Sequence, residues 1–393
     1  MVTRNVHNET VFVAAAFLGA RIVCATVLKI PPMRLLRLPQ ENLSPSSAAP
    51  SNDDLLIHPQ SFPFMNDNKK SRAHMLVAGL VLGCAVAFGQ ESKPVAASPL
   101  PGRGLAQHDF FYAGEAKTRD MCIVRAGQVV WSYHDTDGKG EISDAVLLSN
   151  GSILFAHQFG VTLIAPDKKV LWNYDAPQGC ETHTAQPIGT NFVIFIQNGP
   201  EPKVFVANLA TGKMEREFPL LAGNPKNTHG QFRHARLTYA GTYLVAHMDM
   251  KKVAEYGENG KQVWSADVPG AWSAVRLPNG NTLICGKLVR EINPKGETVW
   301  EFTSADVPDY KFDSMQIAMR LPNGNTLINN WVNQWNGIID SSVAPVQALE
   351  ISPDKKVVWA LRSWNSPNLG PSTTIQLLDE PGVPENVHFG SIK

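Results

Sequence analysis

The feature that most constrains the fold is a phrase that recurs six times. Each copy is a hydrophobic alternation, a tight turn and a second alternation that usually contains Val-Trp. The copies read IVRAGQVVWSY, LIAPDKKVLWNY, VANLATGKMEREF, AEYGENGKQVWSA, EINPKGETVWEF and EISPDKKVVWAL. The residues aligned at the tryptophan position are Trp131, Trp172, Arg216, Trp264, Trp300 and Trp359. Alternation with a period of two on both sides of a turn predicts two antiparallel strands in each copy.

A second phrase precedes the first in most copies. It reads AVLLSNGSILFA, ARLTYAGTYLVA, AVRLPNGNTLIC and AMRLPNGNTLIN, and three of the four contain Asn-Gly, a strong hairpin signal. Two consecutive hairpins form a four-stranded unit with the length of a propeller blade. The sequence therefore predicts an all-β fold, a six-bladed β-propeller with four-stranded blades that spans residues 109–393.

The ring is predicted to close through a composite blade. The first copy, which begins FFYAGEAKTRDMCIVRAGQVVWSY, lacks an innermost strand, and residues 375–378 near the C-terminus supply a candidate. Pairing the two ends of the chain removes strand edges that would otherwise be exposed. The tryptophan column is predicted to be structural, with each side chain wedged between neighbouring blades.

A column of small residues marks the innermost strands. It stands six positions before the turn glycine and contains Ala145, Ala235, Ala274 and Ala318. Small side chains let strands approach one another at the centre of a propeller, so we interpret this column as structural. His183 takes the same register in the third blade, which predicts an imidazole near the axis.

The first 108 residues differ from the repeats. Residues 1–64 have no sustained period and are predicted to be disordered or an over-long gene prediction. Residues 65–89 combine Lys69, Lys70 and Arg72 with an apolar stretch and small residues before Gln90, which is typical of a secretory signal peptide. We therefore expect an exported protein, periplasmic or extracellular, with a linker over residues 90–108. The segment VLGC, ending at Cys84, leaves open a lipoprotein anchor, the only membrane association that we expect besides the signal itself.

Composition excludes some partners and leaves others open. The 35 basic and 35 acidic residues give zero net charge, so we expect no binding to nucleic acid or to an anionic membrane surface. Three widely spaced cysteines follow the predicted signal and do not form a disulfide framework, although one pair could still form: Cys122, Cys180 and Cys285.

The segment HDTDGKGEIS, residues 134–143, resembles a calcium loop. Asp135, Asp137 and Gly140 fit the EF-hand pattern, but Lys139 and Val146 stand where that pattern places ligands. No helices are predicted on either side. We interpret the segment as a polar loop between two blades.

Histidines gather on one predicted face of the propeller. The chain from Gln90 onward holds eight, and six of them fall in loops that share this face: His134, His157, His183, His229, His234 and His247. Imidazole serves as acid, base, nucleophile or metal ligand near neutral pH, so the set predicts a ligand pocket at the mouth of the channel. The loops before the innermost strands also place Glu181 and Trp272 on this face.

We choose candidate site residues from these loops. The catalytic candidates are His183 and His234. The ligand-binding candidates are His134, His157, His229, Arg233, Arg236, His247, Gln316, Trp331 and Trp335. Trp331 and Trp335 belong to an insertion, residues 329–345, that could form a lid or an aromatic wall, or could pack on its own tryptophans.

The segment HGQFRHARL is the densest part of this set. If the innermost strand starts at Phe232, alternation sends His234 and Arg236 to the same side. Such a group suits an anionic ligand such as sulfate, phosphate or carboxylate. Alternatively, Arg236 pairs with a carboxylate on an adjoining blade. The sequence has no zinc-binding spacing, so it predicts no metal site, although ligands from separate blades could still converge. Whether a cofactor is bound stays unknown from the sequence.

The phrases RLPNGNTLI and EINPKGETVWEF resemble the repeats of pyrroloquinoline-quinone-like propellers and of six-bladed bacterial arylsulfotransferases, over about residues 110–380. The resemblance implies the fold, and the second family places histidines and an arginine at the centre of one face. The quinone dehydrogenases have eight blades and often an adjacent Cys-Cys pair, which this chain lacks. The arylsulfotransferases are longer and carry an N-terminal β-domain that this sequence lacks.

Three functions follow as hypotheses. The first is an exported propeller that binds a small molecule or a carbohydrate-derived ligand. The second is an arylsulfotransferase-like enzyme that uses a central histidine. The third is a protein-interaction platform without chemistry. Convergence of at least three histidines favours the first two, an arginine beside a buried histidine favours the second, and scattered histidines favour the third.

Overall fold

The computed structural model describes residues 104–114, 119–134, 140–332, 345–364, 367–380 and Glu385. The predicted N-terminal extension, the signal peptide, residues 90–103 of the linker, Trp335 and positions 135–139 of the calcium-like loop lie outside these residues. Within them the chain forms strands and three 3₁₀ turns: η1 (Gly104–Ala106), η2 (Thr228–Gly230) and η3 (Ser304–Asp306). No helix in this part of the chain has the length and apolar character needed to cross a bilayer.

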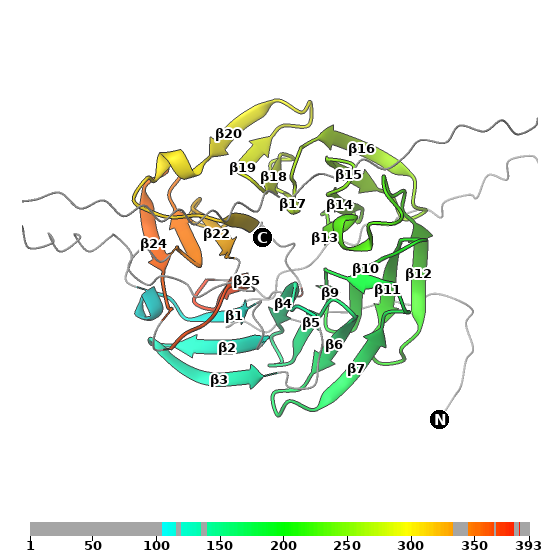
Figure 1. Ribbon diagram of the computed structural model, residues 1–393, viewed down its shortest axis with the longest axis horizontal. Helices are drawn as coiled ribbons and strands as arrows, with labels where there is room; N and C mark the ends of the chain where they lie inside the picture. The colour runs from blue at the N-terminus through cyan, green and yellow to red at the C-terminus, as the bar shows by residue number, and fades with distance from the viewer. Residues whose placement is uncertain are drawn as a thin grey trace, which may run out of the picture. The chain divides into compact units, whose positions relative to one another are not determined.

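Six antiparallel sheets stand in a ring, so the chain is a six-bladed β-propeller as predicted (Figure 1). Blades 1, 2 and 3 form one half of the ring. Blade 1 contains β25 (Ser372–Leu377), β1 (Phe110–Gly114), β2 (Asp120–Arg125) and β3 (Gln128–His134); blade 2 contains β4 (Asp144–Leu147), β5 (Ile153–Ala156), β6 (Gly160–Ile164) and β7 (Val170–Asp175); blade 3 contains β8 (Glu181–Thr182), β9 (Gln186–Ile188), β10 (Phe192–Asn198), β11 (Lys203–Asn208) and β12 (Met214–Pro219).

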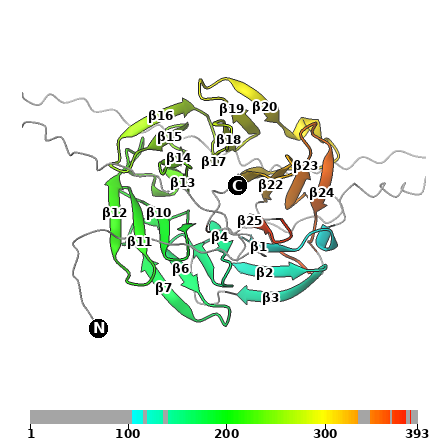
Figure 2. The ribbon, with the colours of Figure 1, turned by 180° about the vertical axis from the view of Figure 1, so that it is seen from behind.

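Three blades complete the ring, which Figure 2 shows from behind. Blade 4 contains β13 (Phe232–Leu237), β14 (Tyr243–His247), β15 (Lys252–Tyr256) and β16 (Gln262–Asp267); blade 5 contains β17 (Ser273–Arg276), β18 (Thr282–Cys285), β19 (Val289–Ile292) and β20 (Thr298–Phe302); blade 6 contains β21 (Ser314–Arg320), β22 (Thr326–Trp331), β23 (Ala348–Ile351) and β24 (Val357–Leu361). In each blade the first strand named lies nearest the centre and the last lies at the outside (Figure 1).

The composite blade is confirmed. β25, from the C-terminal end of the chain, pairs antiparallel with β1, and Tyr112 lies opposite Ile375. The phenol of Tyr112 also donates a hydrogen bond to the backbone oxygen of Gly370 at 2.6 Å. Closure therefore depends on backbone pairing between segments about 260 residues apart, and β25 covers the inner edge of β1 that would otherwise be unpaired.

The tryptophan column joins neighbouring blades, as predicted. Four indole N–H groups donate hydrogen bonds of 2.8–3.2 Å to backbone oxygens of the next blade or of the segment leading into it: Trp131 to Pro166, Trp264 to Pro294, Trp300 to Pro353 and Trp359 to Gly104. Two arginines from the next blade stack on these rings, Arg276 on Trp264 and Arg320 on Trp300. The column is thus part of the seam between blades.

Side chains also join the innermost strands of neighbouring blades. Gln376 in β25 accepts a hydrogen bond from the backbone N–H of Leu147 in β4 and donates one to its carbonyl, at 3.0 and 3.1 Å. Thr184, between β8 and β9, accepts one from the N–H of Ala235 in β13 at 3.2 Å. These bonds satisfy backbone groups that would otherwise be buried without partners. The three cysteines considered above are free buried thiols.

The register predicted for His183 is wrong. The hairpin between β9 and β10 pairs Ile188 with Phe192, whereas the hairpin between β13 and β14 pairs Leu237 with Tyr243, so the loop of blade 3 is shorter by two residues. The turn glycine also stands directly after Ile188 but four positions after Leu237, so counting back from it misplaces the column by three residues, and Gln186 has the pairing position of Ala235. His183 instead occupies the break between β8 and β9, close to the start of the innermost strand.

Candidate functional site

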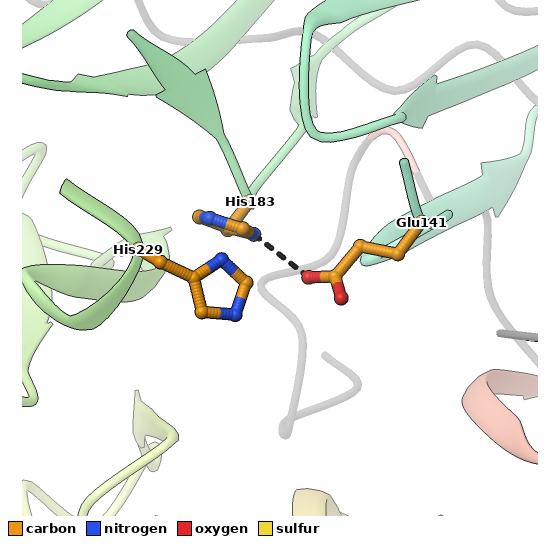
Figure 3. Close-up of side chains that lie close together, drawn as sticks. All are labelled: Glu141, His183 and His229. Carbon is orange, nitrogen blue, oxygen red and sulfur yellow. Dashed lines mark ion pairs between the residues drawn. The ribbon is translucent and has the colours of Figure 1, made fainter. Parts of the chain in front are cut away.

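Five charged or titratable side chains meet where three loops enter the innermost strands of blades 2, 3 and 4. This outer cluster contains Glu141, Glu181, His183, His229 and Arg233. Glu141 precedes β4, Glu181 and His183 flank the end of β8, His229 lies in η2, and Arg233 lies in β13. Figure 3 shows Glu141, His183 and His229 turned toward one another from separate segments.

His183 lies at the centre of the outer cluster and is 1% exposed. Its Nδ1 lies 3.1 Å from Oε1 of Glu141, 3.1 Å from Oγ of Ser143 and 2.9 Å from an Nη1 of Arg233. Its Nε2 lies 2.9 Å from Oε2 of Glu181. Both ring nitrogens of His183 are therefore engaged by protein groups.

His229 differs from His183 because half of its side chain is exposed. Its Nδ1 lies 2.8 Å from the same Oε2 of Glu181, and the two imidazole rings meet edge to face with their centroids 5.1 Å apart. A carboxylate that holds Nδ1 of a histidine orients the ring and leaves Nε2 for chemistry. His229 thus presents the accessible imidazole of the cluster.

Arg233 is held beneath the cluster. Its guanidinium stacks on the ring of Trp272, 4.6 Å from the centroid, and its Nη1 lies 3.4 Å from Oε1 of Glu141. The side chain is only 4% exposed, whereas Trp272 is half-buried. Stacking and charge pairing fix the guanidinium, so it supplies a positioned positive charge next to His183.

Both carboxylates of the outer cluster are held ionised. Burial by itself would raise the pKa of Glu141, but the hydrogen bond and charge of His183, with Arg233 and His229, hold that pKa well below its usual range. Burial also opposes ionisation of Glu181, and its hydrogen bonds to His183 and His229 lower its pKa likewise. Neither carboxyl group can act as a proton donor near neutral pH, so proton transfer at this site falls to imidazole.

The fold holds the outer cluster through the segment before β13. The buried side chain of Gln231 accepts a hydrogen bond from the N–H of Gly199 at 2.7 Å and donates one to its carbonyl at 2.8 Å. Gly199 has φ +154, and a Cβ there would meet Sγ of Cys180 at 2.7 Å, so only glycine fits. This clamp ties the turn that carries His229 to blade 3.

A second group lies farther along the same strands. This inner cluster contains Asp144 in β4, Thr184 after β8, and His234 and Arg236 in β13. Arg236 binds Asp144 through two bonds, Nη1 to Oδ2 at 2.8 Å and Nη2 to Oδ1 at 3.1 Å, and Thr184 donates to Oδ2 at 3.0 Å. Each of these side chains is at most 2% exposed.

The inner cluster tests two predictions that were made from the sequence. His234 and Arg236 do lie on the same side of β13, with Nδ1 and Nη2 3.4 Å apart. The alternative for Arg236, a carboxylate partner, is confirmed, although Asp144 belongs to blade 2 and not to an adjoining blade. Burial lowers the pKa of His234 and outweighs the opposing effect of Asp144, so the structure keeps this imidazole neutral in a closed, paired group.

The three other predicted histidines have partners within their own blades, and Gln316 and Trp331 lie in blade 6. His134 pairs with Asp120 at the exposed end of β3, and His157 contacts Thr162. Nε2 of His247 is hydrogen-bonded to the hydroxyl of Tyr256 at 2.8 Å, and the residue is fully buried. Gln316 forms the bulge of β21, where the register with β22 shifts, and Trp331 ends β22.

Two residues in or beside the outer cluster were not selected from the sequence, and two others were noted on this face without being chosen. Glu141 and Ser143 lie in the segment interpreted above as a polar loop; Glu181 and Trp272 were the two noted. The alternating Glu-Thr-His pattern of residues 181–183 could have indicated Glu181, because residues two apart in a strand lie on the same side and the carboxylate therefore stands beside the imidazole. Nothing local in the sequence indicates Glu141, whose partners are 42 and 92 residues away.

Three side chains of the outer cluster have the donor types of a metal site. One ligand atom each from Glu141, His183 and His229 lie within 4.8 Å of one another, and Glu181 is in contact with both imidazoles. Carboxylate oxygen and imidazole nitrogen are common zinc ligands. The group can therefore bind a cation, orient an anionic ligand or move a proton.

No protein-family model and no curated protein matches the chain. Several solved structures share its fold. A protein of unknown function from Bacteroides caccae is 24% identical, covers 68% of this chain and 98% of its own, and superposes with a TM-score of 0.61. Virginiamycin B lyase from Staphylococcus aureus, solved with quinupristin, is 12% identical, covers 68% of this chain and 90% of its own, and superposes with a TM-score of 0.46. The WD40 propeller domain of Doa1 is 13% identical, covers 56% of this chain and 71% of its own, and superposes with a TM-score of 0.43. At these identities the likeness concerns the fold alone, a β-propeller.

Proposed function

We propose that this propeller binds a small molecule with an anionic group at the outer cluster. The observation that carries the proposal is the convergence of His183, His229 and Arg233 from two blades, with His229 half exposed beside them. Nε2 of His229 is the donor open to an anion, the buried guanidinium of Arg233 adds a fixed positive charge nearby, and the half-buried ring of Trp272 offers a face for an apolar or sugar-like part. An interaction platform without chemistry needs no such group.

Calorimetric titration with p-nitrophenyl sulfate tests the proposal. The probe combines a sulfate with an aromatic ring, so it matches both parts of the site. We expect saturable binding by the intact protein and a loss of at least tenfold in affinity in His229→Ala. His134→Ala is the matched control, because His134 is equally exposed but pairs with Asp120 in blade 1. The absence of saturable binding, or equal affinity in His229→Ala, would refute the proposal.

A second candidate function, sulfuryl transfer, is favoured by the 2.9 Å contact between Arg233 and the buried His183. Because both nitrogens of His183 are engaged, the attacking group would be Nε2 of His229. In that step the nitrogen bonds to sulfur, the bond from sulfur to the phenolate oxygen breaks, and a second phenol then takes the sulfuryl group. The test is release of p-nitrophenol that depends on added phenol; a His229→Ala variant as active as the intact protein would exclude this role.

We also propose that the chain is exported. The support is the cationic and apolar segment at residues 65–89, followed by small residues before Gln90. Expression of the full gene in a bacterial host and mass spectrometry of the periplasmic fraction would test it. The expected mature chain begins at Gln90, and recovery of the intact chain from the cytosol alone would contradict export.

A further inference from the structure

We infer that Glu181, His183 and His229 form a site for a divalent transition-metal ion such as Zn²⁺. The inference deepens the proposed function and rests on it, because the ion would sit where the anionic ligand binds. It also departs from the expectation of no metal site, which considered spacing within single segments of the sequence.

The first observation is that two imidazole nitrogens approach one carboxylate oxygen. Nε2 of His183 and Nδ1 of His229 lie 2.9 and 2.8 Å from Oε2 of Glu181. Two histidines and one glutamate are the donor set of zinc sites that keep a fourth position open for water or substrate. Neutral imidazole and ionised carboxylate are the forms that bind metal.

The second observation is that the opposite nitrogen of His183 has the partners expected behind a metal ligand. Its Nδ1 lies 3.1 Å from Oε1 of Glu141, and Ser143 donates to that same oxygen at 2.9 Å. A histidine that binds metal through one nitrogen usually donates from the other to a carboxylate, which fixes the ring. In the metal-bound form Nδ1 of His183 would carry the proton and donate it to Glu141, while Nη1 of Arg233, which can only donate, would turn from Nδ1 to the same Oε1 of Glu141, 3.4 Å away. Glu141 is thus a positioning residue for His183.

The third observation decides on which side of His183 the ion would lie. Nη1 of Arg233 is 2.9 Å from Nδ1 of His183 and 3.4 Å from Glu141. A guanidinium already supplies positive charge there, so an ion between Glu141 and His183 would be repelled. The Nε2 side, which faces Glu181 and the half-exposed His229, remains as the binding side. An anionic ligand would complete the coordination from solvent.

Metal binding by the tag-free full chain tests the inference. After dialysis against EDTA, titration with Zn²⁺ and measurement of bound metal by mass spectrometry should give one ion per chain. We expect Glu181→Gln and His229→Ala to weaken binding at least 100-fold, and Glu141→Gln to weaken it roughly 10- to 100-fold. His134→Ala should bind like the intact protein. Circular dichroism and thermal unfolding verify that each variant is folded.

Two results would overturn the metal site: no Zn²⁺ bound by the intact chain, or unchanged affinity in His229→Ala. The titration with p-nitrophenyl sulfate, repeated with EDTA and with Zn²⁺, separates the two proposals. Probe binding in EDTA without any uptake of Zn²⁺ removes the metal site and keeps the proposed function. Zn²⁺ uptake without probe binding in either condition keeps the metal site and removes the proposed anionic ligand.

Discussion

The outer and inner clusters are built from the same three blades and from similar residue types, yet they differ in how far their side chains are exposed. In the inner cluster Asp144 binds Arg236 through two bonds and every member is at most 2% exposed. In the outer cluster His229 is half exposed and Glu181 is 16% exposed. A charged group at the centre of a propeller is therefore not by itself a site. Burial of every member together with a two-bond ion pair indicates architecture, whereas an accessible, oriented imidazole indicates function.

The largest loss of stability is expected when the ion pair of the inner cluster is removed. Asp144→Ala removes the carboxylate that holds the guanidinium of Arg236 and leaves a buried charge without its counterion. Removal of one partner from such a pair costs about 3–5 kcal/mol, so we expect the free energy of unfolding in urea to fall by that amount.

The matched control replaces both partners. Asp144→Leu combined with Arg236→Met leaves no buried charge, so it should be more stable than Asp144→Ala. A loss below about 1 kcal/mol in Asp144→Ala would show that the inner cluster is not structural, and the contrast between the clusters would disappear.

A smaller loss of stability is expected when the pH is lowered, and we calculate it for His247. Burial lowers the pKa of this imidazole to about 3, whereas an unfolded histidine titrates near 6.5. The unfolded chain therefore binds more protons below pH 6.5, and stability falls as the pH decreases toward 3. Between pH 7.5 and 4.5 the loss from His247 is roughly 3 kcal/mol. His247→Gln, which keeps a hydrogen-bond acceptor for Tyr256, should flatten this slope.

The same titration distinguishes the clusters. His234, whose pKa burial also lowers, adds to the slope in the same direction. Glu141 and Glu181 have depressed pKa values, so their contribution is present above the pKa of an unfolded glutamate and is lost only in more acidic solution. An unchanged slope in His247→Gln would contradict the assignment of buried neutral histidines.

The repeats predicted the ring because hairpin signals and period-two patterns act locally. The closing strand was found for the same reason, since only one segment near the C-terminus had the right pattern, and β25 occupies it. The site was harder to predict. His183 was assigned the wrong register because one short turn shifted the count, and Glu141 was overlooked because its partners come from other blades. Convergence at a hub is set by tertiary structure, which single-sequence patterns do not encode.

His234 and His229 show how hard it is to distinguish a buried from an accessible histidine by sequence. The two residues lie five positions apart, and the sequence favoured His234 as catalytic. The structure places His234 beside Asp144 and Arg236 in a closed group and places His229 at the surface beside Glu181. The 3₁₀ turn η2 and the Gln231 clamp separate them, and neither has a strong sequence signature.

The most direct test of the account is therefore a matched pair of variants, His229→Asn and His234→Asn, each measured for urea unfolding and for binding of p-nitrophenyl sulfate. We predict that His229→Asn keeps its free energy of unfolding within about 0.5 kcal/mol and loses binding. His234→Asn should lose about 1–3 kcal/mol of stability, while the folded protein still binds the probe. The reverse result, with binding lost only in His234→Asn and stability lost only in His229→Asn, would contradict the division between a structural inner cluster and a functional outer one.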